Sequence, residues 1–173
     1  MQPASSYIPD NRSDATSTDP NRTHQDVANQ HTERIEQELR AAGMSWYGLR
    51  LMESRYLPRV IHHNETIKGV TYGWQPGGVV MLVATDHRII FLDKKPFFLR
   101  DDEVSYDNVR GISYYHAGLA STIVLHTQVQ DYIVRTFNKI SLQKLIDYIE
   151  LRSFEHMNEE GARDDRTNEE WPV

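Results

Sequence analysis

Two short apolar runs separated by a polar turn form the clearest pattern in the chain. Residues 79–84 (VVMLVA) and 89–92 (IIFL) have the length of strands and are rich in Val, Ile and Phe, and the turn Thr85-Asp86-His87-Arg88 lies between them. Such a short connection joins strands in antiparallel fashion, because a parallel pair needs a long crossover. The pattern therefore predicts an antiparallel hairpin.

Strand-like segments continue on both sides of this hairpin, and close turns separate them. Residues 120–127 alternate, with Ile123 and Leu125 on one face and Thr122 and Val124 on the other, whereas the pattern leaves the register of residues 131–137 open. About seven short strands in a row indicate an antiparallel barrel or sandwich. Besides the central hairpin, the predicted strands are residues 66–74, 97–99, 104–106, 109–116, 120–127 and 131–137.

Two helices are predicted before the first strand. The first runs from a capping box at Thr23 and Asp26 to about Ala42, where Gly43 is placed to end it. Its apolar stripe consists of Val27, Ile35 and Leu39. The second helix spans residues 45–56, and four side chains at helical spacing predict its buried face: Trp46, Leu49, Met52 and Tyr56.

The strongest helical pattern follows the last strand, at residues 140–154. Asn138 or Ser141 can cap its start. Its amphipathic stripe must pack against another element, and it consists of Leu142, Leu145, Ile146 and Ile149. A small barrel with one open end needs a plug, and this helix supplies one. The predicted fold class is therefore α+β, mainly β: a barrel of about seven antiparallel strands, capped by a C-terminal helix and preceded by two helices.

Composition and charge separate a folded middle from polar ends. Residues 1–23 contain few apolar groups and are predicted to be disordered, and residues 24–57 form the helical segment. Residues 58–154 form the domain and are nearly neutral, with 11 Lys and Arg against 10 Asp and Glu. Residues 155–173 carry 2 basic and 7 acidic residues and are predicted to be a disordered tail. A neutral domain with an acidic tail argues against non-specific nucleic-acid binding.

The sequence lacks the residues that several classes of function require. The 173-residue chain contains no cysteine, which excludes disulfides, thiol catalysis and zinc held by cysteine. The first residues lack the apolar stretch of a signal peptide, and no apolar window is long enough to cross a membrane. We expect a cytoplasmic protein, with the cytoplasmic face of a membrane as a second possible setting.

Two clusters of polar side chains invite a catalytic or metal-binding interpretation. His62 and His63 precede Glu65, but adjacent histidines on an extended chain point to opposite sides, so we favour solvated turn residues. Asp86, His87 and Arg88 lie together without a nucleophile motif, and turn chemistry explains them better: Asp86 accepts the backbone N–H two residues on, and the arginine pairs with a carboxylate. We therefore expect no enzyme, no cofactor and no metal site.

The segment Lys94-Lys95-Pro96-Phe97-Phe98 is the candidate contact site of the sequence. Two cations beside two aromatic rings at a hairpin tip suit a peripheral contact with an anionic membrane or with a partner, through Lys94, Lys95, Phe97 and Phe98. We favour the simpler interpretation that the phenylalanines begin a strand and that at least one of them fills the barrel.

Aromatic residues and secondary-structure surfaces supply other possible contacts. A stacking platform is less favoured than core and rim packing, because no basic groove accompanies the aromatic set Trp46, Tyr47, Tyr56, Tyr72, Trp74, Tyr114 and Tyr115. The two N-terminal helices either pack on the barrel or offer a helical face to a partner. Exposed edge strands are further docking sites.

The order of these elements resembles a bacterial pleckstrin-homology-like (PH-like) domain, closest to the YokE-like group, over residues 57–154. The resemblance rests on a Leu-Pro pair before the first strand, on the strand-turn-strand pattern with Thr-Asp-x-Arg at residues 82–93, and on the terminal helix. It also rests on Ser105-Tyr106-Asp107-Asn108-Val109 followed by Ile112-Ser113.

The resemblance implies a binding scaffold without a shared active site. Eukaryotic relatives of the fold often hold inositol phosphates with basic residues around the first strand turn. Here Lys68 lies on the first strand, but the turn Gln75-Pro76-Gly77-Gly78 carries no basic residue, which argues against that ligand. We expect a non-enzymatic binding or assembly module that makes protein–protein contacts, including self-association. The alternative is a peripheral membrane-binding module that uses the Lys94–Phe98 tip.

Overall fold

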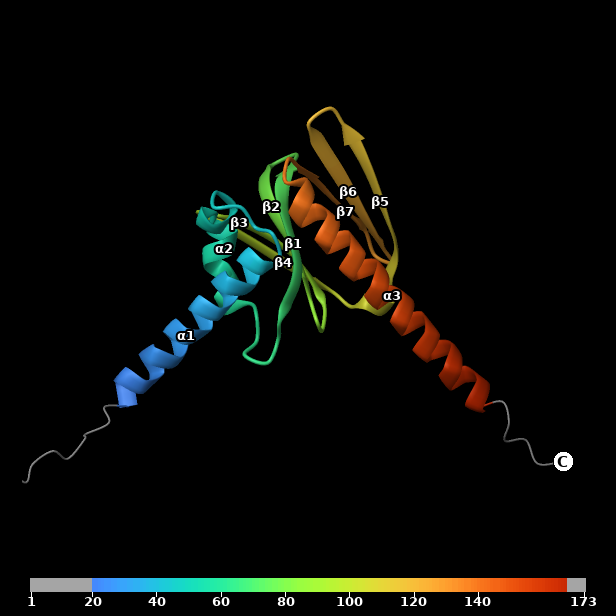
Figure 1. Cartoon of the computed structure of the whole chain (residues 1–173), viewed down its shortest axis with the longest axis horizontal. Coiled ribbons are helices and arrows are strands. Elements are labelled where there is room, and N and C mark those ends of the chain that lie inside the picture. Colours follow the sequence, from blue (N-terminus) through green and yellow to red (C-terminus); the bar gives the residue numbers. More distant parts are fainter. Residues whose placement is uncertain (1–19, 168–173) are drawn as a thin grey trace, which may run out of the picture.

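A computed structural model describes residues 20–167 (Figure 1), with the surroundings of side chains described for residues 24–156. Within these described residues the elements are three α-helices, seven strands and three short 3₁₀ turns. In order they are α1 (Pro20–Ala41), η1 (Gly48–Arg50), α2 (Met52–Tyr56), η2 (Leu57–Arg59), β1 (Ile67–Gln75), β2 (Gly78–Thr85), β3 (Ile89–Lys95), β4 (Phe98–Val104), η3 (Tyr106–Asn108), β5 (Val109–Ala117), β6 (Ala120–Thr127), β7 (Asp131–Thr136) and α3 (Lys139–Thr167).

The seven strands form one antiparallel sheet in the order β4-β3-β2-β1-β7-β6-β5. The predicted fold class, α+β and mainly β with a C-terminal helix, is confirmed. The predicted hairpin at residues 79–92 is β2–β3, paired from Met81–Leu92 to Ala84–Ile89. β4 and β5 are the two edges of the sheet.

The sheet consists of two halves that meet where β1 crosses β7. The only register pair between these two strands is Trp74 with Arg135. Gly73 lies at this crossing, and a Cβ atom there would stand 2.2 Å from the carbonyl oxygen of Arg135. Real Cβ atoms do not approach backbone so closely, so the crossing requires glycine at this position.

Each face of the first half-sheet packs against a different helical layer (Figure 1). One face of β2, with Val80 and Leu82, belongs to a core shared with α3. The opposite face, with Met81 and Val83, belongs to a second core shared with α1 and the segment that follows it. Burial on both faces explains why residues 79–84 are a continuous apolar run and not an alternating one.

The N-terminal segment packs on the sheet, but the prediction of a second helix at residues 45–56 is wrong. α1 buries Ile35 and Leu39 as predicted, but Val27 is exposed. Residues 45–56 do not form one helix, because Leu51 is extended between η1 and α2.

The predicted buried face of residues 45–56 is therefore also wrong. Trp46 is 66% exposed and Met52 is exposed as well, whereas Leu49 and Tyr56 are partly buried. Gly48 faces the sheet instead: a Cβ atom there would lie 2.7 Å from the ring of Tyr72. The small residue allows the close approach, and the large ring of Trp46 is left outside.

The C-terminal helix forms as predicted but is longer. Leu142, Leu145, Ile146 and Ile149 are all buried, and Asn138 caps the helix by accepting the N–H of Ser141 at 3.2 Å. α3 does not end at Phe154 but continues to Thr167. Most of the predicted tail, residues 155–173, is thus helical, while residues 168–173 and residues 1–19 of the N-terminal tail lie outside the described residues.

A buried ion pair holds the β2–β3 turn against the N-terminal layer. Nε and Nη2 of Arg88 donate to the two carboxylate oxygens of Glu65, each at 3.0 Å. Glu65 also accepts the hydroxyl of Thr85 at 2.8 Å and the backbone N–H of His62 at 3.0 Å. Burial by itself raises the pKa of Glu65, but these hydrogen bonds outweigh it and the pKa lies below its usual value. Glu65 therefore stays ionised as the partner of Arg88.

The other polar residues of this turn serve the backbone. The hydroxyl of Thr85 accepts the N–H groups of His87 and Arg88. Asp86 does not accept the N–H two residues on, as predicted, but the N–H of Thr66 at 2.8 Å. Turn chemistry thus accounts for these residues, with the roles distributed differently from the sequence prediction.

The inner face of β6 offers a direct test of this packing. Leu125 is fully buried in the core shared with α3, on the face predicted for it. Replacing it with alanine removes buried surface and leaves a cavity, so Leu125→Ala is expected to lower the free energy of unfolding by about 2–5 kcal/mol. Urea denaturation of both proteins measures the difference. A loss below about 1 kcal/mol would place Leu125 outside a tightly packed core.

Candidate functional site

The predicted contact site forms the tip of the β3–β4 hairpin. Lys95 pairs with Phe98 at the last register position, so Pro96 and Phe97 make the turn. Phe97 is fully exposed and Phe98 is 50% exposed. The expectation that at least one of the two phenylalanines fills the barrel is therefore wrong, because the hairpin extends beyond the core and carries both rings outside.

The lysines of the tip are engaged by their neighbours. Nζ of Lys95 lies 3.0 Å from a carboxylate oxygen of the buried Asp93, and it also lies 5.4 Å from the ring centre of Phe98. Nζ of Lys94 donates to the carbonyl of Lys95 and lies 5.8 Å from the ring centre of Tyr56. The tip thus offers apolar surface more than unpaired positive charge.

A second buried acid stands behind this tip. Glu53 of α2 accepts the backbone N–H of Lys94 at 3.3 Å and is 3% exposed. Burial raises the pKa of Glu53 above its usual value, and the charge of Asp93 adds to that effect, against the hydrogen bonds from the backbone. These acids weaken the attraction of the tip for an anionic headgroup.

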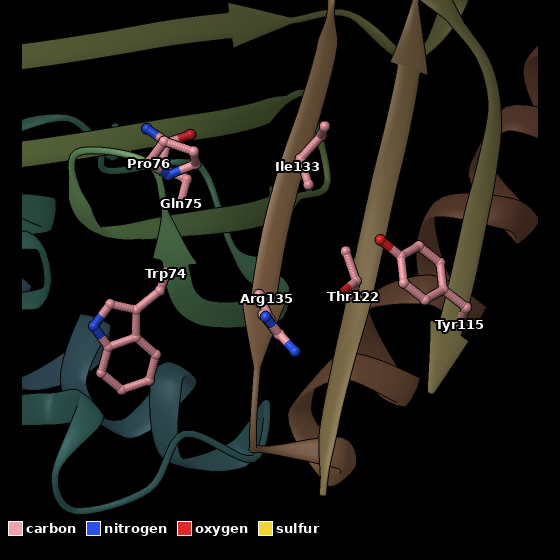
Figure 2. A pocket seen from close by; sticks show the side chains of 7 residues that line it. All are labelled: Trp74, Gln75, Pro76, Tyr115, Thr122, Ile133 and Arg135. Atoms are coloured by element: carbon pink, nitrogen blue, oxygen red, sulfur yellow. The ribbon is translucent and has the colours of Figure 1, made fainter. Parts of the chain in front are cut away.

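A groove on the outer face of the second half-sheet is the other candidate site (Figure 2). Its cavity measures about 400 Å³. A row of side chains crosses it from strand to strand, since Tyr115 pairs with Thr122, Thr122 with Arg135, and Arg135 with Trp74. We call it the aromatic groove, and its lining residues are Trp74, Gln75, Pro76, Tyr115, Thr122, Ile133 and Arg135.

The aromatic groove continues into a wider exposed apolar surface. Trp74, Tyr115 and Ile133 are each about half exposed, and the ring of Phe137 packs edge-on against Trp74 with centres 5.8 Å apart. The N-terminal layer packs on the first half-sheet and α3 packs on the inner face. Within the described residues, no helix covers the outer face of β5–β7.

The structure separates the aromatic residues that the sequence grouped together. Trp74 and Tyr115 lie at opposite ends of the groove, whereas Tyr72 is half-buried and shares a hydrogen bond of 2.7 Å with the hydroxyl of Ser45. Sequence analysis missed Ile133 and Arg135, because the register of this strand was open. The charge of Arg135 was the available signal, since it favours the outer position.

The histidines of the two polar clusters lie at the surface. His62 and His63 are exposed, and Nδ1 of His87 lies 2.9 Å from a carboxylate oxygen of Asp86 at the surface. Among the described residues, no three His, Asp or Glu side chains are arranged to hold a metal ion. No helix of residues 20–167 has the length and apolar character to cross a membrane.

The buried acid behind the tip predicts a pH-dependent effect on stability. Because the pKa of Glu53 is raised in the folded protein, its ionisation opposes folding above the pKa of the unfolded chain and has no effect where both states are protonated. Glu53→Gln keeps an oxygen that accepts the N–H of Lys94 and removes the charge. The variant is expected to melt at a higher temperature than the wild type at pH 7 and at a similar temperature at pH 3. A lower melting temperature at pH 7 would contradict this account.

Comparisons with known proteins found a matching family and similar solved structures. Residues 61–150 match the family of the bacterial PH domain. A DUF1696 family protein with a pleckstrin-homology domain from Shewanella loihica PV-4 is similar in structure, with 19% identity, a TM-score of 0.40, and coverage of 56% of this chain and 91% of that chain. A pleckstrin homology domain from Shewanella amazonensis SB2B has 18% identity, a TM-score of 0.43, and coverage of 60% of this chain and 98% of that chain.

No curated protein matches the chain. These matches do not reach the level of the YokE-like group, which stays a prediction. The family match covers more than half of the chain and coincides with the sheet and the first part of α3. The chain belongs to the bacterial PH domain family.

Proposed function

We propose that this domain is a non-enzymatic interaction module that binds protein through the aromatic groove, and that a second copy of the chain is one of its partners. The observation that carries the proposal is the row of Tyr115, Arg135 and Trp74 on a sheet face that no described helix covers. The cytoplasmic setting expected from the sequence is part of the proposal.

The residue types of the aromatic groove support protein binding. Trp, Tyr and Arg are the side chains that contribute most often to binding energy at protein interfaces. Trp74 and Tyr115 supply apolar area, and Thr122 and Arg135 supply hydrogen-bond donors between them. A contiguous apolar surface with a few polar groups is typical of an interaction site.

A charge placed in the aromatic groove tests this proposal. Size-exclusion chromatography with light scattering on the full chain is expected to show a mass that rises with concentration. Ile133→Asp places a carboxylate at a half-exposed position of the groove and is expected to weaken association by roughly tenfold or more. The matched control is Leu151→Asp, an equal change at an exposed apolar position of α3, which is expected to have no effect. A wild-type chain that stays monomeric, or an equal effect of both changes, would contradict self-association through the groove.

Peripheral membrane binding is the second candidate, and the full exposure of Phe97 favours it. Phe97 and Phe98 can enter the headgroup boundary with Lys94 and Lys95 beside them. Sedimentation with vesicles of phosphatidylcholine and phosphatidylserine is expected to pellet the wild type. Each of Phe97→Ala and Phe98→Ala is expected to reduce the bound fraction, by roughly tenfold in partition coefficient for a fully inserted ring.

The control for membrane binding is Leu119→Ala, at the exposed turn between β5 and β6. This variant is expected to pellet as the wild type does. Absence of the wild type from the pellet would exclude the membrane candidate and leave the aromatic groove unaffected.

A further inference from the structure

The aromatic groove contains one positive charge that lacks a partner within the described side chains. Arg135 lies between Trp74 and Tyr115 in the groove, and it forms no ion pair with any acid of residues 24–156. A guanidinium between aromatic rings suits a carboxylate whose neighbours are apolar or aromatic. The groove therefore favours a short acidic peptide with an aromatic side chain next to the acid.

The chain itself contains such a sequence in residues 168–173, NEEWPV. Glu169 and Glu170 directly precede Trp171 and Pro172. The surrounding segment is also strongly acidic, with 7 acidic and 2 basic residues in residues 155–173. The charge of this segment is complementary to Arg135, and the Trp-Pro pair is complementary to the apolar walls of the groove.

This segment cannot reach the groove of its own chain. α3 has 29 residues, so its axis is about 43 Å long. The helix begins beside Phe137, which packs on Trp74, and it runs away from the sheet toward its far end (Figure 1). Trp171 follows Thr167 by four residues, which span at most about 14 Å. The remaining distance restricts the segment to the groove of another molecule.

We infer that residues 168–173 of one chain dock in the aromatic groove of a second chain. The carboxylates of Glu169 and Glu170 pair with Arg135, and Trp171 packs beside Trp74. This inference rests on the proposed function, because it names the partner of the same groove. The two contacting surfaces are different, so the contact is head-to-tail, and it forms a closed ring or an open chain of molecules.

A pair of complementary variants tests the head-to-tail contact in the full chain. Arg135→Glu disables the groove and leaves residues 168–173 intact. Trp171→Ala disables that segment and leaves the groove intact. In sedimentation velocity, each variant alone is expected to associate at least roughly tenfold more weakly than the wild type. Their equimolar mixture is expected to form dimers and nothing larger, since one working groove and one working tail remain.

A charge exchange provides the matched control. The chain that combines Arg135→Glu with Glu169→Arg and Glu170→Arg is expected to regain association with itself, because both charges of the contact are reversed. Replacement of the other terminal apolar pair, Tyr7→Ala with Ile8→Ala, is expected to have no effect.

If Ile133→Asp abolishes association but Trp171→Ala does not, the groove binds another surface and the tail inference is wrong. Loss of association in the Tyr7→Ala, Ile8→Ala chain would assign the groove to the N-terminal segment instead. If neither Ile133→Asp nor Trp171→Ala alters association, or if the wild type is monomeric throughout, both the inference and self-association through the groove are wrong.

Discussion

Burial of β2 on both of its faces is the constraint on which this structure depends. A strand that is apolar on both sides needs a covering layer on each side, and one helix cannot supply both. α3 covers the face with Leu82, and the N-terminal segment covers the face with Met81. The N-terminal layer is therefore part of the folded unit and not an appendage. Because it is committed to the first half-sheet, the outer face of β5–β7 is left open, and the aromatic groove forms there.

The buried pair of Glu65 and Arg88 fixes where this layer joins the sheet. Arg88 also donates to the carbonyl of Val60 at 3.1 Å and lies 2.5 Å from the carboxylate of Glu103 on β4. One side chain thus connects the N-terminal layer, the β2–β3 turn and an edge strand. Removal of one partner from such a pair leaves a buried charge without compensation, which costs far more than the intact pair contributes. The ion pair therefore specifies how the N-terminal layer joins the sheet more than it adds to stability.

The sequence pattern predicted the elements that are determined by local interactions. It did not predict the features that depend on packing between segments distant in the sequence. The hairpin of β2–β3 and the stripe of α3 follow from periodicity alone. The apolar residues of 45–56 have helical spacing. The close contact of Gly48 with Tyr72 nevertheless places a different face of the segment against the sheet. The position of Arg135 in the groove depends on how β7 pairs with β6, which alternation in the sequence does not determine. The candidate tip was found, but its exposure depends on how far the hairpin extends past the core.

Gly73 limits which substitutions this domain can tolerate. The hydrogen that stands in place of a side chain lets β7 cross β1 at contact distance, and any larger group would meet the backbone of Arg135. The close approach of the two half-sheets at this point therefore depends on the absence of a side chain at position 73. Turns can lengthen and surface residues can vary without disturbing the crossing, whereas a methyl group at position 73 would force the two halves apart.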